Sequence, residues 1–332
     1  PVVAAISGTT EVCAGSTTSL TSATTGGTWS SSNTAVATVN ASTGVVTGVA
    51  AGSATITYTV TTNGCTSNAQ ATVTVNALPV LASIGGTAST CVGSTTTLTN
   101  TTSGGVWTSS ATAVATVNTI TGTVTGVSAG TSTITYTYTN SNGCVSSVTT
   151  TVTINALPTV AAITGTTSVC EGATTALADV TSGGVWTSSN TATATVNAST
   201  GLVTGVAAGS TTITYTVTSI NGCSTSVTTT VTVNAIPVVA AISGTTEVCA
   251  GSTTGLTSAT AGGTWSSSNT ATATVNASTG VVTGVAAGSV TITYTVTING
   301  CTSNAQATVT VNALPVLASI GGTTNACVGS TT

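Results

Sequence analysis

The sequence of 332 residues contains no lysine, arginine, histidine, methionine or phenylalanine. Its charged side chains are four acids, Glu11, Glu171, Asp179 and Glu247, whereas a typical soluble domain has roughly 25% charged residues. Without His or Lys the chain has no imidazole or amine side-chain base, no Schiff-base lysine and no histidine metal ligand. Nucleic acid is excluded as a partner, because binding it requires Lys and Arg to neutralise phosphates. We therefore expect no enzyme, with no catalytic, cofactor-binding or metal-binding residue.

The apolar character of the chain follows from the missing charges. Mean hydropathy is +0.53, yet the sequence has no run near the roughly 18 apolar residues of a membrane helix. We expect no membrane insertion in this segment. The sequence begins at Pro1 without a targeting signal, and we expect a fragment of a longer protein.

Internal repeats give the domain organisation. Proline recurs at Pro1, Pro79, Pro158, Pro237 and Pro315, in steps of 78 or 79 residues, and tryptophan keeps the same step. The sequence predicts domains at residues 1–78, 79–157, 158–236 and 237–314, with the start of a truncated fifth at 315–332. Residues 237–314 match 1–78 with five differences, so three units form one longer repeat.

Within a unit the dominant pattern has a period of two. Threonine alternates with apolar residues over 55–61 and 71–75, which indicates half-buried strands. We predict an all-β fold of tandem β-sandwiches with about seven strands each. Because proline makes each junction stiff, the units should form a rod-like array with about 35–40 Å per unit. One tryptophan and one tyrosine per unit are the predicted core residues: Trp29, Trp107, Trp186, Trp265, Tyr58, Tyr136, Tyr215 and Tyr294.

The nine cysteines are spaced as two per unit with one left over. This parity favours one disulfide within each unit. Closing the loop between the two cysteines should stabilise the unit by about 4 kcal/mol. The predicted pairs are Cys13–Cys65, Cys91–Cys144, Cys170–Cys223 and Cys249–Cys301, and the partner of Cys327 would lie beyond the chain end. Metal binding is the competing interpretation, but the cysteines have no CxxC spacing and no histidine. Stable disulfides indicate a secreted, cell-surface protein.

The tripeptide Asn-Gly-Cys recurs at 63–65, 142–144, 221–223 and 299–301. Asn-Gly between two alternating runs is a strong hairpin signal. The second cysteine of each unit should therefore stand at the start of the last strand.

Four phrases resemble a known family. They are residues 28–33, 36–39, 44–49 and 51–56, and each recurs in all four units with modest changes. They are similar to the bacterial Ig-like domain group 2 (Big2) of invasin- and intimin-like adhesins. The resemblance implies an Ig-like sandwich that serves as a spacer or adhesive module. Cysteine-bearing, threonine-rich versions look like arrays in giant surface proteins of Bacteroidota-type bacteria. The cysteine pair and the near absence of charge depart from the family pattern.

Binding functions remain as alternatives. Threonine rows with tryptophan and tyrosine faces could bind glycans or another surface ligand, and threonine rows also resemble ice-binding surfaces. Residues 40–42, 197–199 and 276–278 fit the N-glycosylation pattern, or else form a turn before a strand. Calcium requires several carboxylates, and no unit has more than two acids.

The function that the sequence favours is a structural repeat segment of a long extracellular bacterial surface fibre or adhesin stalk. Its partners would be neighbouring repeats, other copies of itself in a fibre, and a surface or glycan ligand at a tip outside this segment. Charged side chains normally protect exposed strand edges from pairing with other chains. The scarcity of charged side chains in this sequence therefore favours lateral self-association.

Overall fold

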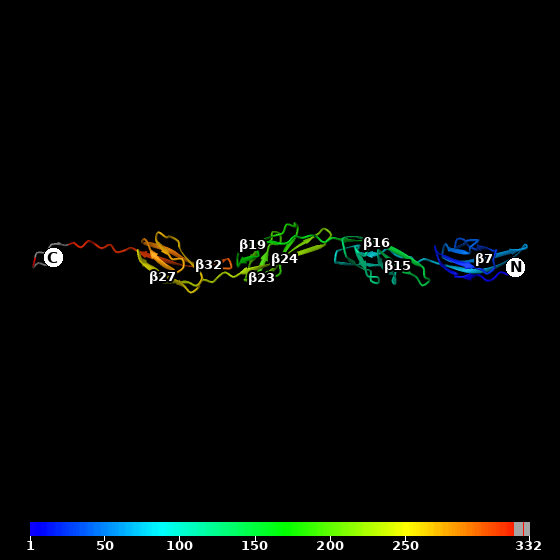
Figure 1. Ribbon diagram of the computed structural model, residues 1–332, viewed down its shortest axis with the longest axis horizontal. Coiled ribbons are helices and arrows are strands. Elements are labelled where there is room, and N and C mark those ends of the chain that lie inside the picture. The colour runs from blue at the N-terminus through cyan, green and yellow to red at the C-terminus, as the bar shows by residue number, and fades with distance from the viewer. Residues whose placement is uncertain (322–327, 329–332) are drawn as a thin grey trace. The chain divides into compact units, whose positions relative to one another are not determined.

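The computed structural model describes residues 1–321 and residue 328, and its regular elements are β-strands (Figure 1). Within these residues no helix is long and apolar enough to cross a membrane. The predicted start of a fifth repeat at 315–332 lies mostly outside the described residues, which omit 322–327 and 329–332. Residues 315–321 have no regular secondary structure.

Each repeat contains eight strands, one more than the sequence indicated. The first repeat holds β1 (Ser7–Gly8), β2 (Glu11–Cys13), β3 (Thr17–Thr21), β4 (Thr28–Ser31), β5 (Ala37–Val39), β6 (Val45–Gly48), β7 (Gly52–Thr62) and β8 (Cys65–Asn76). One sheet has the order β1-β3-β6-β5 and the other the order β2-β8-β7-β4. The strands pair antiparallel except for β2, which pairs parallel to the last three residues of β8.

The other repeats have the same topology. The second holds β9 (Gly85–Gly86), β10 (Ser89–Cys91), β11 (Thr95–Thr99), β12 (Val106–Ser109), β13 (Ala115–Val117), β14 (Thr123–Gly126), β15 (Gly130–Thr139) and β16 (Val145–Asn155). The third holds β17 (Thr164–Gly165), β18 (Ser168–Cys170), β19 (Thr174–Ala178), β20 (Val185–Ser188), β21 (Ala194–Val196), β22 (Leu202–Gly205), β23 (Gly209–Thr218) and β24 (Ser224–Asn234). The fourth holds β25 (Ile242–Gly244), β26 (Glu247–Cys249), β27 (Thr253–Ser258), β28 (Thr264–Ser267), β29 (Ala273–Val275), β30 (Val281–Gly284), β31 (Gly288–Ile298) and β32 (Cys301–Asn312).

The alternation along β7 shows why these residues form a sandwich. Ala54, Ile56, Tyr58 and Val60 are buried, and the threonines between them are only partly buried. Successive side chains of a strand point to opposite faces, so one face of β7 enters the core. β-Branched threonine on the other face suits a pleated surface.

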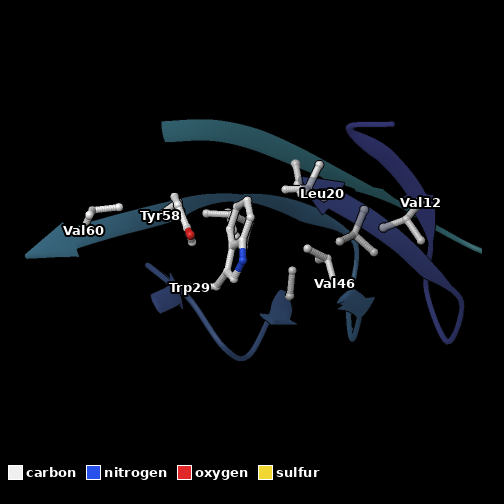
Figure 2. Packing of buried hydrophobic residues seen from close by; sticks show 11 residues of the cluster. Val12, Leu20, Trp29, Val46, Tyr58 and Val60 are labelled. Carbon is white, nitrogen blue, oxygen red and sulfur yellow. The ribbon is translucent and has the colours of Figure 1, made fainter. Parts of the chain in front are cut away.

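The four cores share one arrangement around an aromatic pair. Trp29 packs beside Tyr58 with their ring centroids 4.5 Å apart (Figure 2), and the pairs in the other repeats lie at 4.5–4.6 Å. The tryptophans are 3–6% exposed and the tyrosines of these pairs 3–5%. Aliphatic side chains such as Leu20, Val46 and Ile56 fill the rest of the first core.

The tyrosine hydroxyl also fixes the loop before β4. Tyr58 Oη accepts a hydrogen bond from the Gly27 backbone N–H at 2.8 Å and donates to the Thr24 carbonyl oxygen at 2.9 Å. Gly27 is required for this close approach, because a Cβ atom there would lie 2.5 Å from Tyr58 Cζ. The same two bonds recur at Tyr136, Tyr215 and Tyr294.

The chain divides into two compact units, and one short segment is grouped with a different unit from the rest of its repeat. One unit contains Pro1–Pro158 together with Ser219–Cys223, and the other contains Thr159–Thr218 and the residues from Ser224 onward. A short segment of the third repeat is therefore grouped with the first two repeats.

Candidate functional site

The cysteines join neighbouring repeats. The bridges are Cys13–Cys144, Cys91–Cys223 and Cys170–Cys301, each with Cα atoms 5.6 Å apart and 131 or 132 residues apart in sequence. In each case the first cysteine of one repeat bonds the second cysteine of the next. The predicted pairing within each repeat, Cys13–Cys65, Cys91–Cys144, Cys170–Cys223 and Cys249–Cys301, is therefore wrong.

The register of the long strand explains why pairing within a repeat fails. Cys13 stands opposite Asn76, the last residue of β8, whereas Cys65 is the first residue of that strand. Eleven residues of strand at about 3.3 Å each separate the two cysteines by roughly 36 Å. A disulfide requires Cα atoms within about 7 Å, so the two cysteines of one repeat lie too far apart to bond.

The second cysteine of each repeat lies at a hairpin tip. Cys65 and Cys301 begin the last strand of their repeats, as predicted, whereas Cys144 and Cys223 stand directly before it. In the first repeat Thr62 pairs with Cys65 across a two-residue turn, with φ of 52° at Asn63 and 80° at Gly64. Positive φ at both central positions is the geometry that Asn-Gly favours. In the fourth repeat Asn299 and Gly300 have φ of 51° and 81°. The second and third repeats close the tip with loops at 140–144 and 219–223.

The first cysteine lies in what we call the cysteine groove, a polar depression at the end of β8. Around Cys13 it is lined by Thr9, Glu11, Val12, Ser16, Thr17, Thr18 and Asn76, and by Asn142 from the hairpin of the second repeat. The hairpin of one repeat thus reaches the groove of the preceding repeat.

Polar contacts accompany the bridges. Asn140 Nδ2 donates a hydrogen bond to the Ala77 carbonyl oxygen in the segment between repeats at 3.2 Å. Cys144 Sγ lies 3.9 Å from the Asn76 carbonyl oxygen. At the third bridge Asn234 Nδ2 donates to the Asn299 carbonyl oxygen at 3.4 Å. An asparagine stands three positions before each proline that follows a complete repeat, at Asn76, Asn155, Asn234 and Asn312, and the sequence marks these segments as the junctions between repeats.

Backbone hydrogen bonds hold the groove in place. Ala14 N–H donates to the Asn76 carbonyl at 2.9 Å, Gly15 N–H to the Gly48 carbonyl at 2.8 Å, and Ser16 N–H to the Cys13 carbonyl at 3.0 Å. A Cβ atom at Gly48 would lie 2.8 Å from the Cys13 carbonyl oxygen. Glycine is therefore needed for β6 to pass this close.

Two cysteines in the described residues have no disulfide partner, Cys65 at the first hairpin tip and Cys249 in the fourth groove, and both are exposed. Cys327 lies outside the described residues. Residues 1–321 and 328 contain no group of three or more His, Cys, Asp or Glu side chains that could hold a metal ion.

The other candidate features have local structural roles. Asn40 Oδ1 accepts hydrogen bonds from the backbone N–H groups of Ser42 and Thr43, both at 3.0 Å. Asn197 and Asn276 cap their own turns in the same way. Glu171 Oε1 accepts from the Ala208 N–H at 2.7 Å, and Asp179 Oδ1 from the Thr181 N–H at 2.7 Å.

Comparisons with solved structures give whole-chain similarities at low TM-scores. A Ca²⁺-stabilised ice-binding adhesin from an Antarctic bacterium has 14% identity and a TM-score of 0.31, with 94% of this chain and 100% of that chain covered. A SusE-like surface polysaccharide-binding protein of Bacteroides thetaiotaomicron has 13% identity and a TM-score of 0.28, with 93% and 72% covered. Drosophila N-cadherin EC1-4 has 13% identity and a TM-score of 0.21, with 92% and 98% covered.

The sequence comparisons identify the family. None of the curated protein sequences compared with this chain matches it. The sequence model described as bacterial Ig-like domain (group 2) matches residues 2–75, 145–228 and 226–311, which is well over half of the chain. With its all-β tandem sandwiches and the four phrases quoted above, this chain belongs to the bacterial Ig-like domain family, group 2.

Proposed function

We propose that this chain is a structural segment of a long extracellular fibre or adhesin stalk on a bacterial surface, where it acts as a mechanical spacer. Membership of the bacterial Ig-like family and the three disulfides support an extracellular adhesion or structural role. The single observation that carries the proposal is the pairing of cysteines across neighbouring repeats.

These bridges give the chain a short covalent route. From Cys13 the route crosses to Cys144, follows 26 residues of backbone to Cys170, and crosses to Cys301. At about 3.5 Å per extended residue, that stretch of 26 residues reaches roughly 90 Å. Without bridges the 288 residues from 13 to 301 would reach roughly 1,000 Å. The disulfides therefore hold the ends close together even if every sandwich unfolds, which suits a spacer under tension.

The repeat units of the spacer are proposed at residues 1–78, 79–157, 158–236 and 237–314. In support, each range contains one complete set of eight strands in two four-stranded sheets. Lateral association between fibres is a further part of the proposal. It is supported by surfaces rich in threonine and by a chain with four acidic and no basic side chains.

The buried aromatic pairs favour the spacer over a glycan-binding module. The tryptophan and tyrosine rings of the four core pairs are at most 6% exposed, so they offer little surface on which a sugar could stack. In each repeat the hydroxyl group of the paired tyrosine already accepts a hydrogen bond from a glycine N–H of the neighbouring loop.

Force spectroscopy on single molecules tests the proposal. The chain is pulled from its two ends, with Cys65, Cys249 and Cys327 replaced by alanine so that the three bridges remain. In oxidising buffer we expect the separation of residues 13 and 301 to stay at or below roughly 100 Å, which is the full reach of the bridged route. After reduction, the same molecules should lengthen in steps of roughly 250 Å, one for each sandwich of about 78 residues.

The proposal would fail if the chain lengthened by several steps of roughly 250 Å in oxidising buffer. That result would show that the disulfide bridges do not carry the load.

A further inference from the structure

The last strand of each repeat has one side that is uncovered over most of its length. In the first repeat β8 pairs with β7 on one side, from Cys65 to Val75. On its other side β2 pairs only with the last three residues, Thr74 to Asn76. Within the described part of the chain no further strand joins this sheet, whose order is β2-β8-β7-β4. We call residues 65–73, and the equivalent residues of the other repeats, the open edge.

The open edge recurs in repeats that have a neighbour on both sides. β10 covers β16 only at residues 153–155, and β18 covers β24 only at residues 232–234. The open edges of the second and third repeats are therefore residues 145–152 and 224–231. That of the fourth repeat is residues 301–309. Each sheet in the described residues consists of strands from a single repeat, so the open edge is a property of the repeat itself.

The register shows which backbone groups face outward. Thr74 N–H donates a hydrogen bond to the Thr10 carbonyl oxygen at 2.8 Å, on the side of β8 away from β7. Because backbone groups alternate between the two sides of a strand, every second residue before Thr74 also directs its N–H and C=O away from β7. These outward residues have exposed side chains and are Thr66, Asn68, Gln70 and Thr72. Each offers one hydrogen-bond donor and one acceptor.

The open edge lacks the features that normally prevent edge pairing. Those features are charged side chains, proline, bulges and very short strands. The four open edges contain no charged residue and no proline. The pairing of β7 with β8 runs in unbroken register, so a bulge is also missing there. The strands at the other sheet edges, β1, β4 and β5, have only two to four residues. The open edge is therefore the longest unpaired edge of the repeat.

We propose that the open edge pairs antiparallel with the same open edge of a second copy of this chain. The inference rests on the proposed function, because it names the surface through which fibres associate laterally. Pairing about a two-fold axis lets both copies use the same surface. With Asn68 of one copy opposite Gln70 of the other, the four outward residues of each edge exchange about eight hydrogen bonds. Two four-stranded sheets then become one continuous sheet.

The side chains along the edge favour a second copy as the occupant. Backbone groups alone accept any extended peptide, so the side chains beside them decide which peptide fits. In the proposed register Thr66 stands opposite Thr72 of the second copy, and Ser147 opposite Thr149 in the second repeat. Such hydroxyl pairs hydrogen-bond across antiparallel strands. The four acids of the chain lie outside the open edges, so the pairing brings no like charges together.

The experiment places lysine either on the open edge or one strand further in. It uses the full chain with Cys65, Cys249 and Cys327 replaced by alanine, so that disulfides between copies cannot form. The edge variant carries Gln70→Lys, Thr149→Lys, Thr228→Lys and Gln306→Lys. The matched control carries the same four charges on the residues directly opposite, as Thr57→Lys, Thr135→Lys, Thr214→Lys and Thr293→Lys.

Sedimentation velocity over a range of concentrations measures the association. The parent chain and the control should both form dimers and larger species as the concentration rises. The edge variant should have a dissociation constant at least about tenfold higher, because lysines on facing edges repel each other. Circular dichroism checks that all three chains keep the β-sandwich.

Hydrogen exchange resolved by residue tests the pairing itself. In β16 the amides of Ser147 and Thr149 face outward, whereas those of Val148 and Thr150 face β15. In dilute monomer the outward amides should exchange quickly and the inward amides slowly. On association the outward amides should slow at least about tenfold, because they become hydrogen-bonded.

Four results would overturn the proposal. They are a parent chain that stays monomeric up to its solubility limit, an edge variant that associates as strongly as the parent, a control that loses association equally, and assemblies in which the outward amides still exchange quickly. The force measurement is made on single molecules, so any of these results leaves the test of the spacer role intact.

Discussion

The first and fourth repeats are almost the same sequence in two different covalent settings. Residues 1–78 and 237–314 differ at five positions, and their strands, registers and hairpin turns correspond. Yet Cys301 is buried and bonded to the third repeat, while Cys65 is exposed and unpaired. The sandwich and its hairpin therefore take their structure from the repeat itself, and the neighbour adds only the bond and the burial of the tip.

The largest expected effect comes from removing the bond. Cys170→Ala with Cys301→Ala opens a closed loop of 131 residues, which should destabilise the fourth repeat by up to about 5 kcal/mol in the chain-entropy model. Cys65→Ala in the first repeat should change stability by less than about 0.5 kcal/mol. Guanidinium unfolding followed by hydrogen exchange of pepsin fragments measures each repeat separately. Equal losses at the two sites would contradict the comparison.

Removing the core tryptophan should affect both repeats alike. Trp29 and Trp265 are each 6% exposed and pack on a tyrosine at 4.5 and 4.6 Å. Trp29→Ala and Trp265→Ala should each cost about 3–5 kcal/mol, because both leave a cavity in the same core. The same hydrogen-exchange measurement applies. A cost below about 1 kcal/mol in either repeat would show that the indole is not a central packing residue there.

Removing one hydroxyl should give the smallest effect. Tyr58→Phe and Tyr294→Phe each delete two hydrogen bonds to the loop before the tryptophan strand. We expect a loss of about 1–2 kcal/mol in each repeat and faster exchange of the Gly27 and Gly263 amide protons. Unchanged exchange at these amides would mean that the loops are held by other contacts.

The local architecture was predictable because its signals are local. Alternation of threonine with apolar residues marks β7 and β8, and Asn-Gly marks their turn, since each pattern depends on residues that are neighbours in sequence. The number of short strands per unit indicated a sandwich, and the resemblance to the family indicated its Ig-like form. The extra strand per repeat reflects two-residue elements such as β1, which are too short to produce a periodic pattern.

The disulfide pairing was not predictable from spacing. Pairing within repeats and pairing between repeats both leave cysteines over, so the odd count of nine does not distinguish them. The decisive fact is that Cys65 begins β8 whereas Cys13, on β2, stands beside the other end of β8, and this depends on the parallel register of β2 against β8. That pairing joins residues about 60 apart in sequence, and no local pattern encodes it.

The overlapping bridges also determine how the chain responds to damage. Cys13 and Cys301 are connected by three covalent routes that share no backbone. One follows residues 144–170, the second follows residues 13–91 and 223–301, and the third follows residues 91–144 and 170–223. A single proteolytic cut between Cys13 and Cys301 interrupts one route and leaves the other two intact. At least three cuts, one on each route, are needed to part the two cysteines, so breakage should rise with the cube of the nick frequency.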